Sequence, residues 1–414
     1  KYNHLILMKK NFFERIDLLL LIVTIAVIIS GLLAIFSATY TSGADYFSKQ
    51  LSFSIAGIVL MVFISYIPPK FIAMSSYIIY GLSLVLLVLV LIIGKKISGS
   101  KSWFSVAGFG IQPSEFAKIA TIIALANFLS KSEEGFRNIN RPIEFIKACA
   151  IVLIPVVLIM RQPDMGTSLV FLSLILPVLF WAGLSPYVIF IIISPVLIIL
   201  GAFFGISYFI ASLIIVAIIL LLFKRNIFIT AGVMVLNIII GYSFDSLYRK
   251  LQPYQQNRIN ALFDPTTDPL GSGYNVIQSK VAIGSGGLFG KGFLQGTQTQ
   301  LKFIPEQWTD FIYCMIGEEF GFVGSIIILI LYMIIIFQLV NNAYLSKNKF
   351  LSICCIGFAS IILFHLVINV GMTIGIMPVI GIPLPMMSYG LSSLLSFMVM
   401  MGIGMSAYRY RKQF

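Results

Sequence analysis

The stretch DLLLLIVTIAVIISGLLAIFSA, residues 17–38, decides the medium in which this chain folds. After Asp17 it holds no charged residue for about 20 positions, which is the length a helix needs to cross the hydrocarbon core of a bilayer. Hydrophobic residues make up 59% of the 414-residue chain and charged residues 10%, so no water-soluble fold could cover this much apolar surface. Because a bilayer core offers no water to backbone amides and the alternation typical of a membrane barrel is absent, we predict an all-α polytopic membrane protein.

Apolar segments of this kind recur along the whole chain, and we treat residues 1–414 as one integral membrane domain. The seventh and eighth segments are the least secure, since they could form one broken helix. The twelve segments lie at roughly 17–37, 50–67, 71–94, 112–130, 145–160, 167–183, 187–202, 206–223, 228–244, 311–339, 351–372 and 387–407.

Basic residues set the expected orientation in the membrane. Placing the N-terminus in the cytoplasm puts most lysines and arginines of the short loops inside, among them Lys70, Arg137 and Lys347, as the positive-inside rule requires. Both termini are then cytoplasmic, and the first segment is a retained span rather than a signal peptide. The net charge of +13 is explained by these loops facing anionic lipid, so nucleic-acid binding is not indicated.

One large loop, residues 245–310, falls on the extracytoplasmic side in this topology. Apolar residues scattered through it, such as Val276, Leu288 and Phe289, predict an ordered lid packed on the helices. Its glycine run GSGGLFGKG, residues 284–292, lacks the preceding strand and the Lys-Ser/Thr ending of a nucleotide-binding loop. Two interpretations stay open: the glycines only turn the chain, or their amides bind a lipid-linked phosphate with the nearby basic residues Lys280, Lys291 and Arg258.

Charged residues inside or beside apolar segments are costly and therefore informative. Gln112, Glu115 and Lys118 are spaced three apart, so they form one stripe on a helix, with Glu115 able to pair with Lys118. Such a stripe is expected to face a cavity, although a buried ion pair that only locks helices together is the alternative.

Four further acids lie at the start of an apolar segment or within one. Asp164, between Pro163 and Gly166, is explained by capping the following helix, and Asp310 could cap the tenth helix in the same way. Glu318 and Glu319 lie about two helical turns beyond Asp310, and a pair of acids so deep in a span is harder to explain structurally. The cysteines and histidines show no metal-ligand spacing and are interpreted as packing residues or helix contacts; they are Cys149, Cys314, Cys354, Cys355, His4 and His365.

Five stretches together resemble the SEDS family, for shape, elongation, division and sporulation, and its rod-elongation branch more than its division branch. They are QPSEFAK (112–118), RQPDMGTS (161–168), DPLGSGYNVIQSKVAIGSGGLFGKGFLQGTQTQLKFIPEQWTDFIY (268–313), IGEEFGFVG (316–324) and NVGMTIGIMPVIGIPLPMMSYG (369–390). Each match alone is weak, but all run in the family's order. The resemblance implies a core of about ten spans, so two of the twelve would be additional and fall between residues 187 and 244.

The resemblance implies a peptidoglycan glycosyltransferase of the bacterial cytoplasmic membrane, with its active face outside. Such an enzyme polymerises lipid II, a disaccharide-pentapeptide on undecaprenyl diphosphate, together with a class B penicillin-binding protein and other membrane proteins of the elongation complex. A Mg or Mn ion is a possible requirement, and no organic cofactor is expected. A lipid II flippase and a scaffold that only recruits partners are the alternatives; the absence of a clear inverted repeat weighs against a transporter.

The resemblance also assigns roles to individual residues. Asp310 matches the aspartate of the TDF motif, to which a base-like catalytic role is assigned. Where the family usually has histidine, arginine and glycine, this chain has Trp308, Ser102 and Leu391, and Lys101 is a candidate to replace the charge of the missing arginine. The resemblance marks Lys118, Glu115, Gln112, Asp164, Trp103 and Glu306 as substrate-binding residues. Lys291 and Arg258 are added as expected substrate contacts because they are basic residues near the glycine run.

Overall fold

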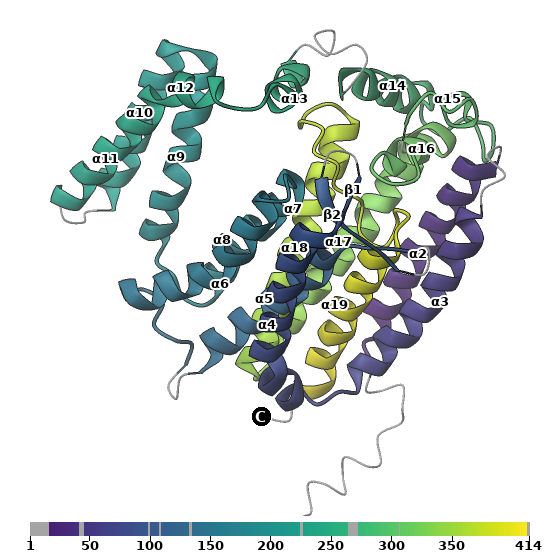
Figure 1. Ribbon diagram of the computed structural model, residues 1–414, viewed down its shortest axis with the longest axis horizontal. Helices are drawn as coiled ribbons and strands as arrows, with labels where there is room; N and C mark the ends of the chain where they lie inside the picture. Colours follow the sequence, from purple (N-terminus) through teal and green to yellow (C-terminus); the bar gives the residue numbers. More distant parts are fainter. Residues whose placement is uncertain are drawn as a thin grey trace, which may run out of the picture.

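Each of the twelve apolar segments folds as a helix, or as two consecutive helices, in the computed structural model (Figure 1). The structure describes residues 16–40, 45–97, 100–106, 109–131, 135–223, 227–263, 272–305 and 307–411. Within these ranges, eight helices are at least 18 residues long and apolar enough to cross a membrane, and shorter apolar helices accompany them. The prediction of an all-α multi-pass membrane protein is therefore confirmed.

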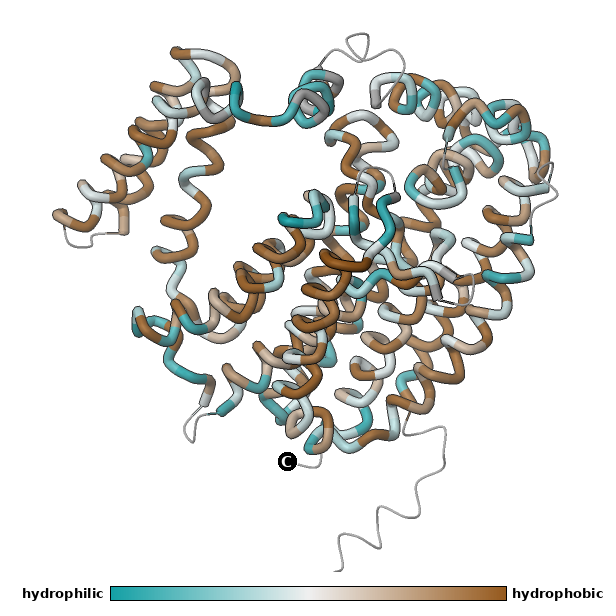
Figure 2. Tube along the Cα trace, viewed as in Figure 1, coloured by the Kyte–Doolittle hydropathy of each residue, from teal (hydrophilic) through white to brown (hydrophobic). Residues whose placement is uncertain are grey.

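Most of the helices run side by side across one main bundle (Figure 1). Hydrophobic residues follow their whole length and hydrophilic residues gather near their ends, as Figure 2 shows. The helices of the main bundle are α2 (Leu18–Thr39), α3 (Tyr46–Ser65), α4 (Pro69–Ile93), α5 (Pro113–Ser130), α6 (Pro142–Met160), α7 (Met165–Ser173), α8 (Ile175–Trp181), α16 (Ile312–Glu319), α17 (Gly321–Leu345), α18 (Lys349–Thr373) and α19 (Leu391–Tyr410).

Local sequence signals explain where several helices begin. Proline is the first residue of α4, α5, α6 and α9 (Pro186–Phe204), a position where its fixed φ suits a helix and its missing N–H is not needed. Asp17 caps α2, because its Oδ1 accepts from the Leu20 amide at 3.1 Å. Its Oδ2 accepts from Gln338 and Asn342 at 2.8 Å each, so this buried carboxylate also ties α2 to α17.

The centre of the bundle is formed by α5, α18 and α19, whose residues are mostly buried. The short helix α16 is buried at every residue. Helices α2, α3, α4, α6 and α17 present apolar side chains outward, as lipid contact requires. The loop between α18 and α19, residues 374–390, enters the bundle at one end and packs on α2. At Gly31 a Cβ would lie 2.5 Å from the Met387 carbonyl oxygen, so only glycine allows this close approach.

Helices α9, α10 (Ile206–Leu222) and α11 (Ile227–Tyr242) form a smaller unit at the left of Figure 1. They have a core of their own, made of Tyr187, Ile198, Val216 and Leu220. Gly205, at φ 117°, separates α9 from α10, and the two helices pack against each other. They are therefore two antiparallel helices and not one broken helix, which resolves the alternative that the sequence left open.

The polar segments gather at one end of the bundle, opposite the last turn of α19 (Figure 1). Three short strands form an antiparallel sheet before α5, which the sequence did not predict: β1 (Lys95–Ile97), β2 (Ser100–Val106) and β3 (Phe109–Ile111). The long loop contains four helices: α12 (Phe244–Arg249), α13 (Pro253–Phe263), α14 (Ser272–Ser285) and α15 (Thr297–Gln300).

Helix α14 lies on the bundle, where the Ser279 hydroxyl donates to the Thr373 carbonyl at 2.7 Å. The expectation that the apolar residues of the loop pack on the bundle holds only in part. Val276 is buried, but Leu288 is 65% exposed and Phe289 is 80% exposed.

Candidate active site

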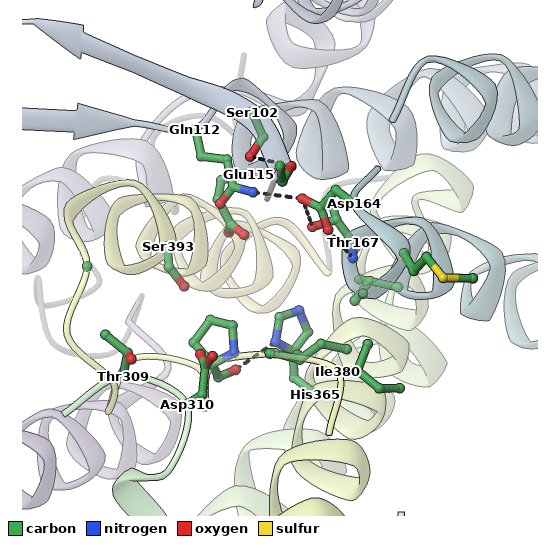
Figure 3. A pocket seen from close by; sticks show the side chains of 18 of the residues that line it. Ser102, Gln112, Glu115, Asp164, Thr167, Thr309, Asp310, His365, Ile380 and Ser393 are labelled. Carbon is green, nitrogen blue, oxygen red and sulfur yellow. Dashed lines mark hydrogen bonds between the residues drawn. The ribbon is translucent and has the colours of Figure 1, made fainter. Parts of the chain in front are cut away.

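A cavity of about 1050 Å³ lies where the polar segments meet the bundle (Figure 3). Its walls come from β2, α5, the turn before α7, α7 itself, α13, α14, the segment before α16, α18, the loop 374–390 and the start of α19. Seven residues predicted from the sequence line it together: Trp103, Gln112, Glu115, Lys118, Asp164, Arg258 and Asp310. Of the remaining two, Lys291 is not among the lining residues, and Glu306 lies outside the described residues.

The stripe on α5 forms one wall of the cavity. Lys118 and Glu115 are 1% and 4% exposed, and the ammonium nitrogen lies 2.8 Å from Glu115 Oε2. The Ser396 hydroxyl of α19 donates to the same carboxylate at 3.0 Å. The pairing predicted from spacing is confirmed, and both interpretations of it apply, because the pair joins α5 to α19 and also faces the cavity.

His365 lies beside Lys118 and was assigned no role in the site from the sequence. Its Nδ1 lies 2.9 Å from the Pro383 carbonyl oxygen, which can only accept, so Nδ1 carries the proton. The lone pair of Nε2 then faces Lys118 Nζ at 3.4 Å. The sequence offered one usable signal, since His365 stands four residues before Asn369 and both lie on the same face of α18.

Asp164 caps α7 as predicted and also joins two walls of the cavity. Its Oδ1 accepts from the Thr167 amide at 3.0 Å, and its Oδ2 accepts from the Gln112 side chain at 3.1 Å. Burial raises the pKa of this carboxyl above its ordinary value, and the negative charge of Glu115 acts in the same direction, while the hydrogen bonds from Thr167 lower it.

Asp310 lies one position before the N-cap residue of the following helix. Helix α16 begins at Ile312 with Phe311 as its N-cap residue, and no acid stands in its first turn. A Cβ placed at Gly381, whose φ is 74°, would lie 3.2 Å from Asp310 Oδ2. The carboxylate thus lies against a glycine of the loop 374–390, and Figure 3 shows it across the cavity from Glu115.

The positions at which this chain departs from the family pattern have local partners. Trp308 stacks on Tyr46, with ring centroids 5.3 Å apart and planes 21° apart. Ser102 is buried at the cavity wall. Lys101 donates to the Ile92 carbonyl at 2.8 Å and does not line the cavity, so it does not replace the charge of an arginine there.

Lys291 and the paired acids lie in a second polar cluster, away from the cavity. Lys291 Nζ lies 2.8 Å from Glu318 Oε1, and Glu318 also accepts from the amides of Gln298 and Thr299 at 2.9 and 3.0 Å. Glu319 accepts from the Ser37 hydroxyl of α2. These acids therefore fasten the segment around α15 to the bundle, a structural role that the sequence did not indicate.

The glycine run packs closely on α16. A Cβ at Gly286 would lie 2.0 Å from the Gly317 carbonyl oxygen, and a Cβ at Gly290 would lie 2.1 Å from that of Glu319. This close backbone approach accounts for the glycines and favours their structural interpretation.

Whether a divalent cation fits the cavity depends on its oxygen donors. Among the residues that the structure describes, no three His, Cys, Asp or Glu side chains are grouped so that they could hold a metal. Two cavity carboxylates are already engaged, Glu115 by Lys118 and Asp164 by Thr167 and Gln112. The described residues thus form no ready protein cage for Mg or Mn, and a metal requirement stays a prediction.

Known proteins are similar to this chain both in sequence and in fold. The chain is 35% identical to the peptidoglycan glycosyltransferase RodA of Treponema pallidum, over 94% of this chain and 96% of that protein. It is 34% identical to the peptidoglycan glycosyltransferase MrdB of Escherichia coli, over 98% of this chain and 97% of that protein.

Two solved structures extend the likeness to the fold. A chain from a study of how a peptidoglycan synthase complex coordinates polymerization and crosslinking superposes with a TM-score of 0.73 at 28% identity, over 96% of this chain and 99% of that one. The rod shape determining protein RodA of Thermus thermophilus matches with a TM-score of 0.62 at 24% identity, over 96% and 98% of the two chains, which shows the shared fold alone.

The family model for FtsW, RodA and SpoVE, described as cell cycle proteins, matches residues 12–213 and again residues 184–413. The two matches together take in almost the whole sequence and overlap in the region of α9 and α10. The chain belongs to the FtsW/RodA/SpoVE family of cell cycle proteins, the SEDS family that its motifs resemble.

Proposed function

We propose that this chain is a peptidoglycan glycosyltransferase that polymerises lipid II during cell elongation. Relatives with that activity in their names align over nearly the full length of both chains. The observation that carries the proposal is the cavity itself, which gathers Asp310, the buried Lys118–Glu115 pair and Arg258 around one space of about 1050 Å³. A volume of this size suits a sugar unit with its diphosphate.

In the proposed reaction, the 4-hydroxyl of an N-acetylglucosamine attacks the anomeric carbon of a second unit. The new C–O bond forms as the bond to the diphosphate breaks, and the leaving undecaprenyl diphosphate takes the electron pair. Asp310 accepts the proton of the attacking hydroxyl, as a carboxylate in hydrogen-bond reach can do.

Lys118 and Arg258 offset the negative charge that builds on the leaving diphosphate. Glu115 holds Lys118 in place at 2.8 Å, and the lone pair of His365 faces the same ammonium. Gln112, Asp164 and Trp103 would contact the sugars from the wall formed by β2, α5 and the start of α7. Lys291 and Glu306 stay predicted substrate contacts, although Lys291 is engaged by Glu318.

The proposed location is the bacterial cytoplasmic membrane, with both termini inside and the cavity open to the outside. The distribution of basic residues supports this orientation: Arg137 and Lys347 lie in short connections, and Lys70 in the first turn of α4, at the end opposite the cavity. The proposed partners are a class B penicillin-binding protein, which would crosslink the new strands, and the other membrane proteins of the elongation complex. The likeness to a chain of a synthase complex that couples polymerization to crosslinking supports the first of these.

The test is polymerisation of labelled lipid II by the purified protein with its penicillin-binding protein, comparing wild type with Asp310→Asn. Asp17→Asn is the matched control, because Asp17 is also a buried carboxylate but lies at the other end of the bundle. We expect Asp310→Asn to bind lipid II and to make no glycan, and Asp17→Asn to retain activity in proportion to its folded fraction.

Polymerisation by Asp310→Asn at the wild-type rate would show that Asp310 is not the base. A wild-type protein that makes no glycan but moves lipid II between the leaflets of vesicles would replace the proposal with the flippase alternative. A wild-type protein that neither makes glycan nor moves lipid II, in cells whose elongation tolerates changes at both Asp310 and Lys118, would favour the scaffold.

A further inference from the structure

The backbone on both sides of the Asp310 Cα atom is held by side chains from other elements. The peptide before it, through the Thr309 carbonyl, accepts from the Ser388 hydroxyl at 2.6 Å. The peptide after it, through the Asp310 carbonyl, accepts from the Asn369 side-chain amide at 2.8 Å. Because both flanking carbonyls are fixed, the direction of the Cα–Cβ bond of Asp310 is fixed as well.

Asn369 joins Asp310 to the loop that faces its carboxylate. The same amide nitrogen donates to the Ile382 carbonyl at 2.8 Å, so both of its hydrogens are used. Ile382 follows Gly381, the residue whose missing side chain leaves room for Asp310 Oδ2. One amide group, 0% exposed, therefore sets the spacing between the carboxylate and the loop beside it.

Ser388 works in the same way from the far end of the loop. Its hydroxyl oxygen accepts from the Leu384 amide at 2.9 Å, so its single hydrogen is available for the Thr309 carbonyl. The neighbouring Tyr389 amide donates to the Trp308 carbonyl at 3.0 Å. Three consecutive carbonyls, those of residues 308 to 310, are thus bound by groups from α18 and from the loop 374–390.

Neither Asn369 nor Ser388 lines the cavity, in contrast to Asp310 and Thr309. Direct contact with a substrate in the cavity is therefore not what these two side chains provide. A general base, however, must be held in hydrogen-bond reach of the proton it removes, and misplacing a reacting group by about 1 Å can cost about 100-fold in rate.

We propose that Asn369 and Ser388 are positioning residues that act through Asp310 by fixing the peptide groups on either side of it. This inference rests on the proposed function, in which Asp310 is the base. It assigns the asparagine of α18 and the serine of the SYG stretch, residues 388–390, to the geometry of catalysis and not to substrate binding.

The experiment compares Asn369→Ala with Asn127→Ala, because Asn127 is a closely matched control. Asn127 is also a buried asparagine between helices, donating to the Ala73 carbonyl at 2.9 Å and to the Ser76 hydroxyl at 2.6 Å, and it does not line the cavity. For each variant, with the penicillin-binding protein present, kcat, KM for lipid II, lipid II binding and the melting temperature are measured.

We expect Asn369→Ala to lower kcat by roughly 10- to 100-fold with KM and lipid II binding little changed. Asn127→Ala should lower the melting temperature without a comparable loss of kcat. Ser388→Ala should lower kcat in the same manner, and Ser388→Thr should restore much of it, because threonine keeps the hydroxyl that donates to the Thr309 carbonyl.

Equal effects of Asn369→Ala and Asn127→Ala on kcat at equal loss of melting temperature would overturn the inference, leaving Asn369 a structural residue. If Asn369→Ala does not fold, the smaller substitutions at Ser388 test the inference instead. A Ser388→Ala variant with wild-type kcat would then overturn the inference. Asp310→Asn is run beside them: activity in that variant refutes the proposed base itself, whereas an inactive Asp310→Asn with fully active Asn369→Ala and Ser388→Ala refutes only the positioning role.

Discussion

Lys118 is a charged residue in the centre of an apolar bundle, where an unpaired ion is very costly. Lys118→Met alone would leave Glu115 buried without its partner, so we expect a loss of about 3–5 kcal/mol of unfolding free energy. The double variant Lys118→Met, Glu115→Gln should regain most of this stability and still lack activity. Unfolding in detergent, followed by tryptophan fluorescence, measures the stability of the single and of the double variant. A single variant as stable as the double would contradict the expectation.

Asp164 offers a test of its capping role. Asp164→Ala removes the acceptor for the Thr167 amide and should cost about 1 kcal/mol, whereas Asp164→Asn keeps an oxygen for that bond and should cost less. Melting temperatures of the two variants against wild type give the comparison. Equal losses of melting temperature in Asp164→Ala and Asp164→Asn would mean that the charge of Asp164, and not its capping bond, stabilises the fold.

The same residue predicts a pH dependence. Burial raises the pKa of Asp164 in the folded state, so the folded protein favours the protonated carboxyl and binds more protons than the unfolded chain. The stability that this group contributes is present at low pH and is lost as the pH rises through its folded pKa. Asp164→Asn should therefore gain melting temperature relative to wild type as the pH is raised from about 4 to 8; a constant difference would contradict the raised pKa.

Among the elements, the segment around α15 depends on one carboxylate. Glu318 binds Lys291 and accepts from the amides of Gln298 and Thr299. Glu318→Gln should therefore weaken three bonds at once, and a hydrogen bond to a charged group contributes about 1.5–3 kcal/mol to stability. We expect faster hydrogen exchange at residues 291–303 than in wild type. The half-buried pair Arg137–Glu144 supplies the control variant Glu144→Gln, which should leave that segment unchanged.

The elements that the sequence predicted are those with a local signal. Long apolar runs identified the spans, spacing of three predicted the Glu115–Lys118 pair, and the proline and glycine around Asp164 marked a helix start. The strands β1–β3 and the path of the loop 374–390 had no such signal. The contacts that place Asp310 join it to residues far along the chain, Asn369 being 59 positions away, and periodicity in one sequence does not reveal such pairs.

For the whole molecule, the orientation of α9 and α10 fixes the side on which the cavity opens. If both cross the membrane, the exposed Ser207 at the start of α10 is outside and the exposed Lys347 between α17 and α18 is inside. In intact cells an impermeant maleimide should label Ser207→Cys and not Lys347→Cys. The parent protein is the background control, since three of its four cysteines are buried. Labelling of Lys347→Cys alone would reverse the proposed orientation.

The walls of the cavity are far apart along the chain, and this has a consequence for biosynthesis. Asp310 leaves the ribosome well before Asn369 and before Ser388, which is 79 positions beyond Thr309. A nascent chain that has inserted α2 to α17 thus contains the acid but not the groups that fix its backbone, and the start of α19 is still missing from the cavity wall. Competence for glycan synthesis can therefore arise only when the last two spans have joined the bundle, so a prematurely terminated chain has no complete site with which to consume its substrate.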